Sequence, residues 1–537
     1  MLQKESSSLH ENPPPIHAHN KFNSKSLKRN FLYILGVLLF LICCFFCAKY
    51  SVIGLGETVE KSRKTLILTL FLTFLCASKS TYKFFVLPVA LLVSLYSPVG
   101  FEYGPPDMQA TLSFYATDMA ESIEFVSMIP AKTYLKAILI SLLPFIAYRI
   151  ALLINLQPWK NKTYVLCMIG FLVILLKPTS FIDKSLDAID ASEKALTELN
   201  RYVSKSSWGA SISSTQNKDY ILVIGESARR DYFHIYGYPV ENTPFLDNGP
   251  VTIVNGLTSG DTYTVGSLRL MLTHGNQEKW EPRYDLNLID MAKSANIETT
   301  WISNQGLIGR HDTPIAAIGN RADQSFFPNK QAYNKKNFSD FLLLSIFDKQ
   351  IIKETNRSRL FVLHTLGSHA NACAKLEDFP DVYKVNDLKL RYVACYVSTI
   401  KKTDNFLEKL YTRMKKHEVE SGRPFSILYV GDHGQAHREH NGQVVLVNNL
   451  KSKYHYDIPL ILIESDSKEK RLLESKKSGL LFTAGLAHWM NIKNDLLPAY
   501  DLFDGKNDDR DFGLNEKIGA ITTPKDPAID IRNVLIQ

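Results

Sequence analysis

The sequence predicts an α/β protein in two parts: an N-terminal five-helix transmembrane region, followed by a domain with a doubly wound, mostly parallel sheet. Three observations predict this fold. Long apolar runs are confined to the first third of the 537 residues. In the remainder, short β-branched and aromatic runs alternate with helical patterns. Polar residues collect where these short runs end. The two parts also agree with the length of the chain, which is too great for one ordinary domain.

The membrane region contains five apolar runs, at about 31–48, 65–77, 84–98, 136–156 and 163–178. The first, fourth and fifth approach the roughly 20 residues that a spanning helix needs. The first run resembles a signal peptide, but four more apolar runs follow it, so we interpret it as a retained anchor. We therefore predict a cytoplasmic tail over residues 1–30 and a five-span region over 31–180.

Basic residues indicate the orientation of these spans. They occur in the N-terminal segment and in the second-to-third and fourth-to-fifth connections, at Lys79, Lys83, Arg149, Lys160 and Lys162. The first loop opposes this pattern, because it carries Lys49, Lys61, Arg63 and Lys64. More basic residues lie on the side of the N-terminus than on the opposite side, which favours a cytoplasmic N-terminus. Five spans then place the rest of the chain outside the cytoplasm.

A charged helical stretch is expected to link the membrane region to the second domain, with the linker at 181–215 and the domain at 216–537. Apolar strands are predicted at 220–225, 297–303, 360–365, 425–430 and 458–463. Helical patterns between them indicate a mostly parallel sheet with helices on both faces. In such sheets, ligands bind beyond the carboxyl ends of the strands.

Three pairs of polar residues follow separate predicted strands. They are Glu226 with Ser227, His364 with His369, and Asp432 with His433. Carboxylates and imidazoles that converge from separate strands are suitable ligands for a divalent ion such as zinc. One Asp-His dipeptide alone is usually an ordinary loop, but three clusters at strand ends predict a metal site.

Two hydroxyl groups are candidate nucleophiles for transfer of a phosphoryl-type group at such a metal. Ser227 lies beside Glu226. Thr264 follows a polar turn and opens an apolar helical pattern, where backbone N–H groups and the helix dipole attract an anion. This position favours Thr264 modestly, while Ser227 can cap a following helix.

The second domain contains two cysteines, Cys373 and Cys395, whereas the other five lie in apolar runs. An isolated pair in an exported domain predicts a disulfide. On the chain-entropy model, a loop of about twenty residues would contribute up to about 3 kcal/mol.

The connection at about 99–135 is long and mixed in character. Its stretch Met108–Val126 is expected to form an amphipathic helix on the membrane surface. Ser113, Thr117 and Glu121 have helical spacing and would share one face, which is most often simply solvated.

These motifs together resemble the phosphoethanolamine transferases of the alkaline phosphatase and sulfatase superfamily. The resemblance covers nearly everything after residue 30. It includes Val223-Ile-Gly-Glu-Ser-Ala-Arg-Arg-Asp231, Tyr236-Gly-Tyr-Pro, the Thr264 loop, His364-Thr-Leu-Gly-Ser-His369 and Gly431-Asp-His-Gly434. Within the family, the chain is most similar to the branch that modifies periplasmic glucans in Gram-negative bacteria.

This resemblance implies an alkaline phosphatase/sulfatase-type domain in which Glu226, Asp432 and His433 bind zinc. It implies that Thr264 is both a ligand and the nucleophile, taking phosphoethanolamine from phosphatidylethanolamine and passing it to an acceptor. His369 matches a phosphate-binding histidine. Thr117, Glu121, Ser113 and Asn304 match the surroundings of the ethanolamine head group, although family members commonly have Asn in place of Ser113.

One departure from the family concerns a second histidine after Asp-His-Gly. A gapless count places Asn448 there, and His437, His440 and His455 lie at other offsets. The resemblance therefore implies one zinc ion, and leaves open a second ion and the proton donor to the leaving group.

Two alternative functions accompany this interpretation. One is a membrane glycerol-phosphate transferase of the lipoteichoic acid synthase type, and the other is a catalytically inactive membrane scaffold. The net charge of +8 is spread out, so no nucleic acid partner is expected. The expected location is the bacterial inner membrane, with the catalytic domain in the periplasm and an envelope glycan or lipopolysaccharide as acceptor.

Overall fold

The computed structural model describes residues 24–56, 62–106, 111, 126, 129–166 and 181–536, apart from short gaps after residue 181. Those gaps are 184, 191–192, 194–196, 198–204, 216, 306–313, 329–338, 449–451 and 523. The chain divides into two compact units. The helical unit comprises residues 1–97 and 135–177, and the sheet unit comprises 98–134 and 178–537.

The helical unit consists of apolar helices. Its elements are α1 (Ser24–Gly54), α2 (Ser62–Leu75), α3 (Lys79–Thr81), a π-helical turn (Tyr82–Val86), most of α4 (Leu87–Tyr103) and most of α7 (Ala131–Leu153). Three stretches are long and apolar enough to cross a membrane, namely Lys28–Gly54, Lys79–Tyr103 and Ala131–Leu153.

The predicted count of five spans is therefore not reached among the described residues. With 14 residues, α2 is shorter than the roughly 20 that a spanning helix needs. Most of the fifth predicted run lies outside the described residues.

The sheet unit is built on one eight-stranded sheet. Its strand order is β12-β3-β11-β8-β2-β7-β5-β6. In that order, the strands cover Arg471–Leu473, Val251–Val254, Leu460–Glu464, Phe425–Gly431, Asp219–Gly225, Arg359–His364, Glu298–Ser303 and Gln324–Phe326. Every residue of β2, β7 and β8 is buried, which explains why the centres of these strands are continuous apolar runs.

The prediction of a mostly parallel sheet holds for the half around β2 and is wrong for β11. Strands β8, β2, β7, β5 and β6 are all parallel. In contrast, β11 runs antiparallel to both β8 and β3. The chain between β8 and β11 contains a hairpin and, among its described residues, no crossover helix, so it returns in the opposite direction.

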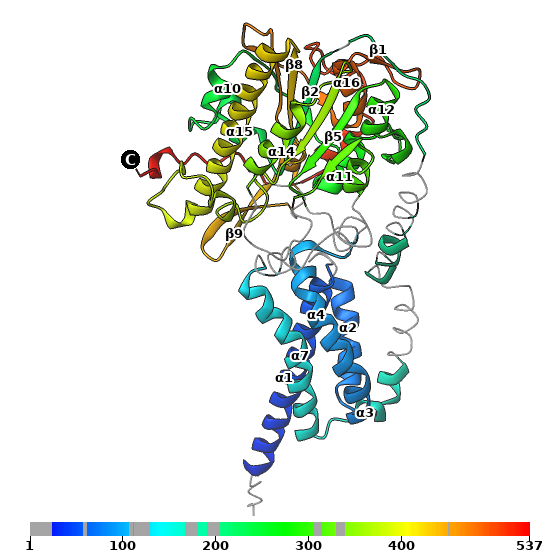
Figure 1. Cartoon of the computed structure of the whole chain (residues 1–537). Coiled ribbons are helices and arrows are strands. Elements are labelled where there is room, and N and C mark those ends of the chain that lie inside the picture. The colour runs from blue at the N-terminus through cyan, green and yellow to red at the C-terminus, as the bar shows by residue number, and fades with distance from the viewer. Residues whose placement is uncertain are drawn as a thin grey trace, which may run out of the picture. The chain divides into compact units, whose positions relative to one another are not determined.

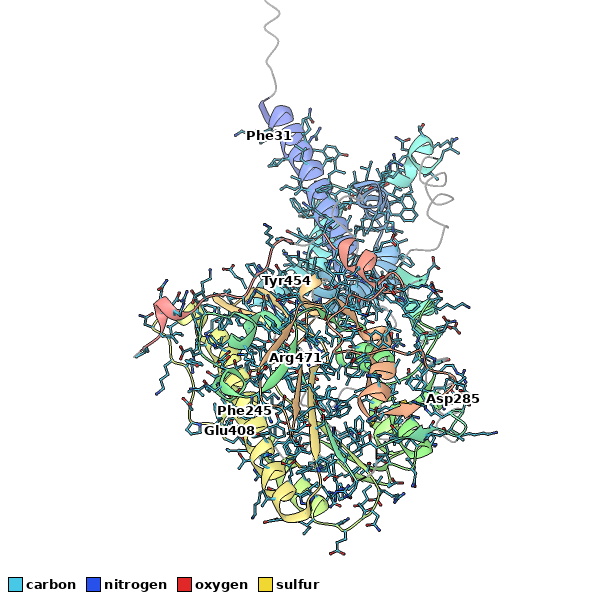
Figure 2. All side chains as sticks on the ribbon, turned by 90° about the horizontal axis from the view of Figure 1, so that it is seen from above. Phe31, Phe245, Asp285, Glu408, Tyr454 and Arg471 are labelled. Atoms are coloured by element: carbon cyan, nitrogen blue, oxygen red, sulfur yellow. A yellow bond between two sulfur atoms is a disulfide. The ribbon has the colours of Figure 1, made fainter. Side chains whose placement is uncertain are left out.

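Helices cover both faces of this sheet (Figure 1). One face packs against α11 (Thr264–Met271), α12 (Leu288–Ser294), α13 (Pro314–Gly319) and α16 (Phe482–Trp489). The other packs against α10 (Pro244–Asn248), α14 (Phe341–Ile351) and α15 (Arg391–Ser421). Figure 2 labels Phe245 and Glu408, which belong to the contacting helices α10 and α15. A short helix, α17 (Leu514–Gly519), belongs to a smaller apolar cluster.

Three short ladders complete the sheet unit. They are β1 (Ile212–Ser213) with β14 (Ile492–Lys493), β4 (Leu257–Thr258) with β13 (Lys477–Ser478), and the hairpin β9 (Ala436–His440) with β10 (Gln443–Val447). The hairpin begins three residues after His433, and β4 ends six residues before Thr264. Both ladders therefore adjoin segments that carry predicted site residues. The predicted linker is helical at 181–183 and 185–190.

Candidate active site

Two neighbouring parallel strands place Glu226 and Asp432 side by side. The last residues of β2 and β8, Gly225 and Gly431, are paired in register. Glu226 follows the first strand, and Asp432 and His433 follow the second. Because both strands end at the same edge of the sheet, these side chains meet there.

Thr264 reaches the same point from a helix. It is the first residue of α11, as its polar turn and apolar helical pattern predict. Its Oγ1 lies 3.0 Å from Glu226 Oε2 and 3.3 Å from His433 Nε2. Of the two candidate nucleophiles, Ser227 and Thr264, it is Thr264 that directs its hydroxyl between the two ligand side chains.

The spacing of the donor atoms fits a small tetrahedral cation. His433 Nε2 lies 3.4 Å from both Glu226 Oε1 and Asp432 Oδ2. Glu226, Asp432 and His433 form the one metal-type cluster of three among the described residues. Zinc ligands about 2.0 Å from the ion are separated by about 3.3 Å in a tetrahedron. The observed separations therefore match the edges of a zinc site.

An unpaired oxygen supports the same interpretation. Asp432 Oδ2 is buried and has no hydrogen-bond partner among the described residues. A buried carboxylate oxygen without a partner is costly. A divalent cation bound by Glu226, Thr264, Asp432 and His433 would remove this cost, so the residues fit zinc.

The electrostatics show how strongly these groups interact. Burial opposes the charged form of Glu226, but the hydrogen bond and charge of His433 outweigh burial and hold the Glu226 pKa far below its ordinary value. Burial and the Glu226 carboxylate raise the pKa of Asp432. Burial opposes ionisation of His433, yet the two carboxylates raise its pKa to about 9. The cluster therefore retains protons on Asp432 and His433, and a bound cation would take the place of these protons.

Ser227 forms hydrogen bonds with two of the candidate metal ligands, Glu226 and Asp432. It has a left-handed backbone conformation, with φ of 56°, which is unusual for serine. Its backbone N–H donates to Asp432 Oδ1 over 2.8 Å, and its hydroxyl donates to Glu226 Oε1 over 2.6 Å. The expected capping role is therefore wrong, because the hydroxyl binds the Glu226 carboxylate. The strained turn orients both carboxylates at once.

Gln305 is a site residue that the sequence reasoning missed. Its Nε2 donates to Glu226 Oε2 over 3.1 Å and to the Thr365 carbonyl over 2.9 Å. The signal that could have found it is its place directly after β5, in Ser-Asn-Gln. The resemblance selects the neighbouring Asn304 instead, whose side chain donates to Asp340 Oδ1 over 2.8 Å.

The loop after β7 packs directly on Glu226. Ser368 N–H donates to the Glu226 carbonyl over 2.9 Å. Gly367 has φ of 44°, and a Cβ there would lie 2.9 Å from both the backbone N and O of Glu226. Asp340 accepts from the backbone N–H groups of Leu366 and Gly367. This loop therefore carries His369 to the site through contacts that only glycine permits at residue 367.

His369 itself stays close to the charged cluster. Burial lowers its pKa, while the charge of Glu226 opposes this effect. A neutral imidazole at this position can donate one hydrogen bond and accept another.

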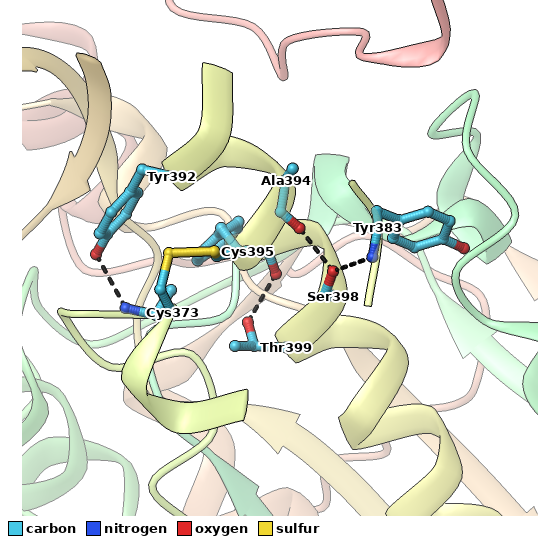
Figure 3. The surroundings of a disulfide bond; sticks show 9 residues. Cys373, Tyr383, Tyr392, Ala394, Cys395, Ser398 and Thr399 are labelled. Carbon is cyan, nitrogen blue, oxygen red and sulfur yellow. Dashed lines mark hydrogen bonds between the residues drawn. A yellow bond between two sulfur atoms is a disulfide. The ribbon is translucent and has the colours of Figure 1, made fainter. Parts of the chain in front are cut away.

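A disulfide fixes the end of this loop to α15 (Figure 3). It joins Cys373 and Cys395, 22 residues apart. Near it, Thr399 Oγ1 lies 2.8 Å from Ser368 Oγ, and Ala372 N–H donates to Tyr392 Oη over 3.3 Å. Helix α15 therefore holds the loop both covalently and through hydrogen bonds.

The three histidines considered as substitutes at position 448 have different surroundings. His437 is held between Asp526, at 2.6 Å, and Tyr232. His440 lies 3.0 Å from the Asn441 amide. His455 is buried, and its Nε2 donates to the Val447 carbonyl over 3.0 Å.

Asn448 accepts a hydrogen bond from Gln435 over 2.8 Å, three residues after Asp432. Asn448 is therefore hydrogen-bonded to the loop that carries Asp432 and His433. Ser113, Thr117 and Glu121, predicted near the ethanolamine head group, lie outside the described residues.

Comparisons with known proteins show which family the chain resembles. The family model described as Sulfatase matches residues 218–492. A Haemophilus influenzae protein named "Putative phosphoethanolamine transferase" is 39% identical over 428 residues, covering 78% of this chain and 87% of that protein. Phosphoethanolamine transferase OpgE of Escherichia coli strain K12 is 30% identical over 430 residues, covering 75% and 79% respectively.

A solved structure is similar over both units. It is the integral membrane lipooligosaccharide phosphoethanolamine transferase A (EptA) from Neisseria meningitidis, with a TM-score of 0.56 and 15% identity. The match covers 86% of this chain and 97% of that one, and at this identity it concerns the fold.

The family model and the relatives that match most of the chain lead to one assignment. The family expected from the motifs is confirmed: this chain belongs to the phosphoethanolamine transferase family, with a domain of the sulfatase family.

Proposed function

We propose that this protein transfers phosphoethanolamine from phosphatidylethanolamine to an envelope glycan or lipopolysaccharide, through a covalent intermediate on Thr264. One observation carries the proposal. The Thr264 hydroxyl lies within 3.0–3.3 Å of Glu226 and His433, which themselves form a metal-type cluster with Asp432. A hydroxyl in this environment is suited to act as a nucleophile on phosphorus.

The reaction takes place in two displacements. Thr264 Oγ1 gives up its proton and attacks the donor phosphorus, the bond between phosphorus and the diacylglycerol oxygen breaks, and that oxygen takes up a proton so that the diacylglycerol leaves as an alcohol. An acceptor hydroxyl then attacks the same phosphorus, breaks its bond to Thr264 and restores the threonine hydroxyl. Bound zinc supplies Lewis acidity, which lowers the hydroxyl pKa and offsets charge on the phosphoryl oxygens.

The chain's own residues prepare the nucleophile. Glu226 Oε2 accepts the Thr264 hydrogen bond, and Gln305 and Ser227 hold the two oxygens of that carboxylate. Thr264 at the start of α11 places the phosphoryl group near free backbone N–H groups. We assign phosphate binding to His369, and head-group contacts to Ser113, Thr117, Glu121 and Asn304.

The proposed location is the bacterial inner membrane, with the sheet unit in the periplasm. Three apolar helices of spanning length and the distribution of basic residues support it. The names of the relatives support the transferred group, and the word lipooligosaccharide in the name of the meningococcal protein supports an envelope acceptor. The convergence of Thr264 with Glu226, Asp432 and His433 supports an enzyme over an inactive scaffold.

The test compares Thr264→Ala with Ser227→Ala. Thr264→Ala should abolish cleavage of phosphatidylethanolamine, because no other hydroxyl reaches both Glu226 and His433 among the described residues. Ser227→Ala removes one support of Glu226 and should retain some turnover.

Without acceptor, mass spectrometry should find a phosphoethanolamine adduct on the peptide that contains Thr264. An adduct on Ser227, or full activity in Thr264→Ala, would show that the proposed nucleophile is wrong.

A further inference from the structure

Asp340 is a buried carboxylate that contacts two loops of the candidate active site. It directly precedes α14 and is 8% exposed. Its Oδ1 accepts from the Asn304 side-chain amide and from Leu366 N–H, each over 2.8 Å, and its Oδ2 accepts from Gly367 N–H over 3.0 Å. One side chain therefore joins the segment after β5 to the loop after β7.

The place of Asp340 in the chain would suit a different task. An aspartate just before a helix usually accepts hydrogen bonds from the first N–H groups of that helix. Asp340 makes no such bond to α14, all of whose residues the structure describes. Ser339 has this role instead, because its hydroxyl accepts from Phe341 N–H and its carbonyl accepts from Leu342 N–H. Both carboxylate oxygens of Asp340 therefore bind the site loops rather than its own helix.

The contacts of Asp340 continue to His369 through the backbone. Asp340 accepts from Leu366 N–H, and the Leu366 carbonyl accepts from His369 N–H over 3.1 Å. The carboxylate therefore fixes the start of the turn that carries the imidazole.

The same contacts continue to Glu226. Asp340 Oδ2 holds Gly367 N–H, and Gly367 is so close to the Glu226 backbone that a Cβ would lie 2.9 Å from it. The next residue, Ser368, donates its N–H to the Glu226 carbonyl over 2.9 Å. A shift of this loop would therefore move both His369 and the backbone of Glu226.

The carboxylate also determines how the Asn304 amide is oriented. Because a carboxylate only accepts hydrogen bonds, the NH₂ end of the amide faces Asp340 and the carbonyl end points away from it. The backbone of Asn304 is fixed as well, since its N–H donates to the His364 carbonyl over 2.8 Å. Asp340→Asn would place a second NH₂ group at this contact, so that neither orientation of the Asn304 amide would be selected.

We propose that Asp340 is a positioning residue, which holds the Asn304 amide and the His369 loop in the geometry that phosphoryl transfer requires. It forms no hydrogen bond or ion pair with the metal-type cluster or with Thr264, all of which the structure describes, so it acts through its neighbours. The catalytic part of this role rests on the proposed function, whereas the anchoring of the loop does not.

The test compares Asp340→Asn with the matched control Asp404→Asn in the full-length protein. Asp404 is also buried, and its carboxylate accepts from the N–H groups of Phe245 and Leu246 over 2.9 and 3.0 Å. Each substitution therefore removes a buried carboxylate that binds two backbone N–H groups, but only Asp340 contacts the site loops. Melting temperatures and zinc contents of both variants check the fold and the metal site.

The first measurement is a single turnover with phosphatidylethanolamine, followed through the adduct on Thr264. Its amplitude reports how much protein is folded, and its rate constant reports the geometry of the folded fraction. The rate constant should fall about 10- to 100-fold in Asp340→Asn and stay within about twofold in Asp404→Asn. Asp340→Ser, which keeps one accepting oxygen without the amide hydrogens, is the second variant and should show the same pattern as Asp340→Asn.

The second measurement is hydrogen exchange of a peptide that contains residues 366–369. Leu366 and Gly367 lose their charged acceptor in Asp340→Asn, so this peptide should exchange about tenfold faster. In Asp404→Asn its exchange should be unchanged.

The outcomes separate the two proposals. A rate constant within about twofold of that of the unmodified protein in both Asp340 variants, or equal losses in Asp340→Asn and Asp404→Asn, would overturn the positioning role. If the unmodified protein forms no adduct on Thr264, while residues 366–369 still exchange faster in Asp340→Asn, the proposed function fails and the anchoring of the loop stands.

Discussion

At the scale of single residues, the geometry of the site depends on backbone contacts of neighbouring residues as well as on the candidate metal ligands themselves. Ser227 takes a left-handed conformation to bind Asp432 through its backbone and Glu226 through its hydroxyl. Gly367 lies so close to Glu226 that a side chain has no room. These two residues orient carboxylates that burial alone would leave protonated.

We predict that Gly367→Ala impairs the site. The new Cβ would lie 2.9 Å from two Glu226 backbone atoms, and the residue has φ of 44°. The combined cost should be about 2–3 kcal/mol, with a loss of donor cleavage that exceeds the loss of folded protein.

The matched control is Gly422→Ala. Gly422 also has positive φ, 71°, but a Cβ added there would meet no atom within 4 Å. This variant should cost about 1 kcal/mol and leave activity intact. Equal activity losses in both variants would contradict a specific contact with Glu226.

A second residue-scale prediction concerns pH. Burial, followed by the charges of His433 and Arg229, lowers the pKa of His455 to about 3. Between about pH 6.5 and pH 3 the unfolded chain binds a proton at this histidine and the folded protein does not. His455 therefore contributes stability that is complete above about pH 6.5 and falls by about 1.4 kcal/mol per unit as pH decreases.

Melting temperatures measured at about pH 7 and about pH 5 check this prediction. His455→Gln can still donate to Val447, and it should reduce the loss of stability at the lower pH by about 2 kcal/mol. His488→Gln is the control, because that side chain is 56% exposed. The same pH dependence in His455→Gln and in the unmodified protein would contradict the prediction.

At the scale of elements, α15 positions the site, because it forms hydrogen bonds with the loops that carry the site residues. Tyr396 Oη accepts from Arg229 N–H over 2.9 Å and donates to the Ser227 carbonyl over 2.7 Å. Thr399 lies 2.8 Å from Ser368 on the second loop. The first three turns of one helix therefore fix the loops after both β2 and β7.

We predict that the disulfide maintains this arrangement. Cys395 lies in the same turns of α15, and Cys373 follows the loop that carries His369. Replacing both cysteines by serine should reduce stability by about 3 kcal/mol on the chain-entropy model.

The effect on activity should exceed that of partial unfolding, because the disulfide anchors the His369 loop. Donor cleavage measured below the melting transition, with and without reductant, checks this. Full activity with free thiols at both positions would contradict a role for the disulfide in the site.

The longer strands of the sheet could be predicted from the sequence, and the shorter ones could not. Strands β2, β5, β7 and β8 are predictable because each has six or seven residues, most of them apolar or β-branched. The strands β3, β6 and β12 have only three or four residues, too few for a clear period. The direction of β11 depends on the intervening hairpin of β9 and β10. The apolar run of β10 (Gln443–Val447) predicts a strand but does not by itself show which way the chain returns.

The site residues, too, could be predicted from the sequence only in part. Ligand-type residues can be selected by residue type and position after a strand. The role of Gln305 cannot, because it depends on which of two adjacent amides turns toward Glu226. A cavity lined by Arg230, Lys477 and Asp508 also combines segments more than 200 residues apart, so no local pattern predicts it.

At the scale of the whole molecule, metal binding should be coupled to folding. The donor atoms adjoin β2, α11 and β8, so a bound cation would join three elements of the sheet unit. A ligand that binds only the folded state at a hundredfold excess over its dissociation constant adds about 2.7 kcal/mol.

We therefore predict that chelation lowers the melting temperature of the zinc-loaded protein. Glu226→Gln and Asp432→Asn should lose zinc and show little further change on chelation. Zinc measured by atomic absorption, together with the melting temperature, checks both statements. Unchanged zinc content in both variants would rule out the site.

The separation of the ligands along the chain has a consequence for biosynthesis. Glu226 and Asp432 are more than 200 residues apart, although they adjoin paired strands. A growing chain carries Thr264 long before the ribosome has made Asp432 and His433. The proposed nucleophile therefore remains without its neighbours throughout most of translation, and the centre can be completed only after Asp432 and His433 have left the ribosome.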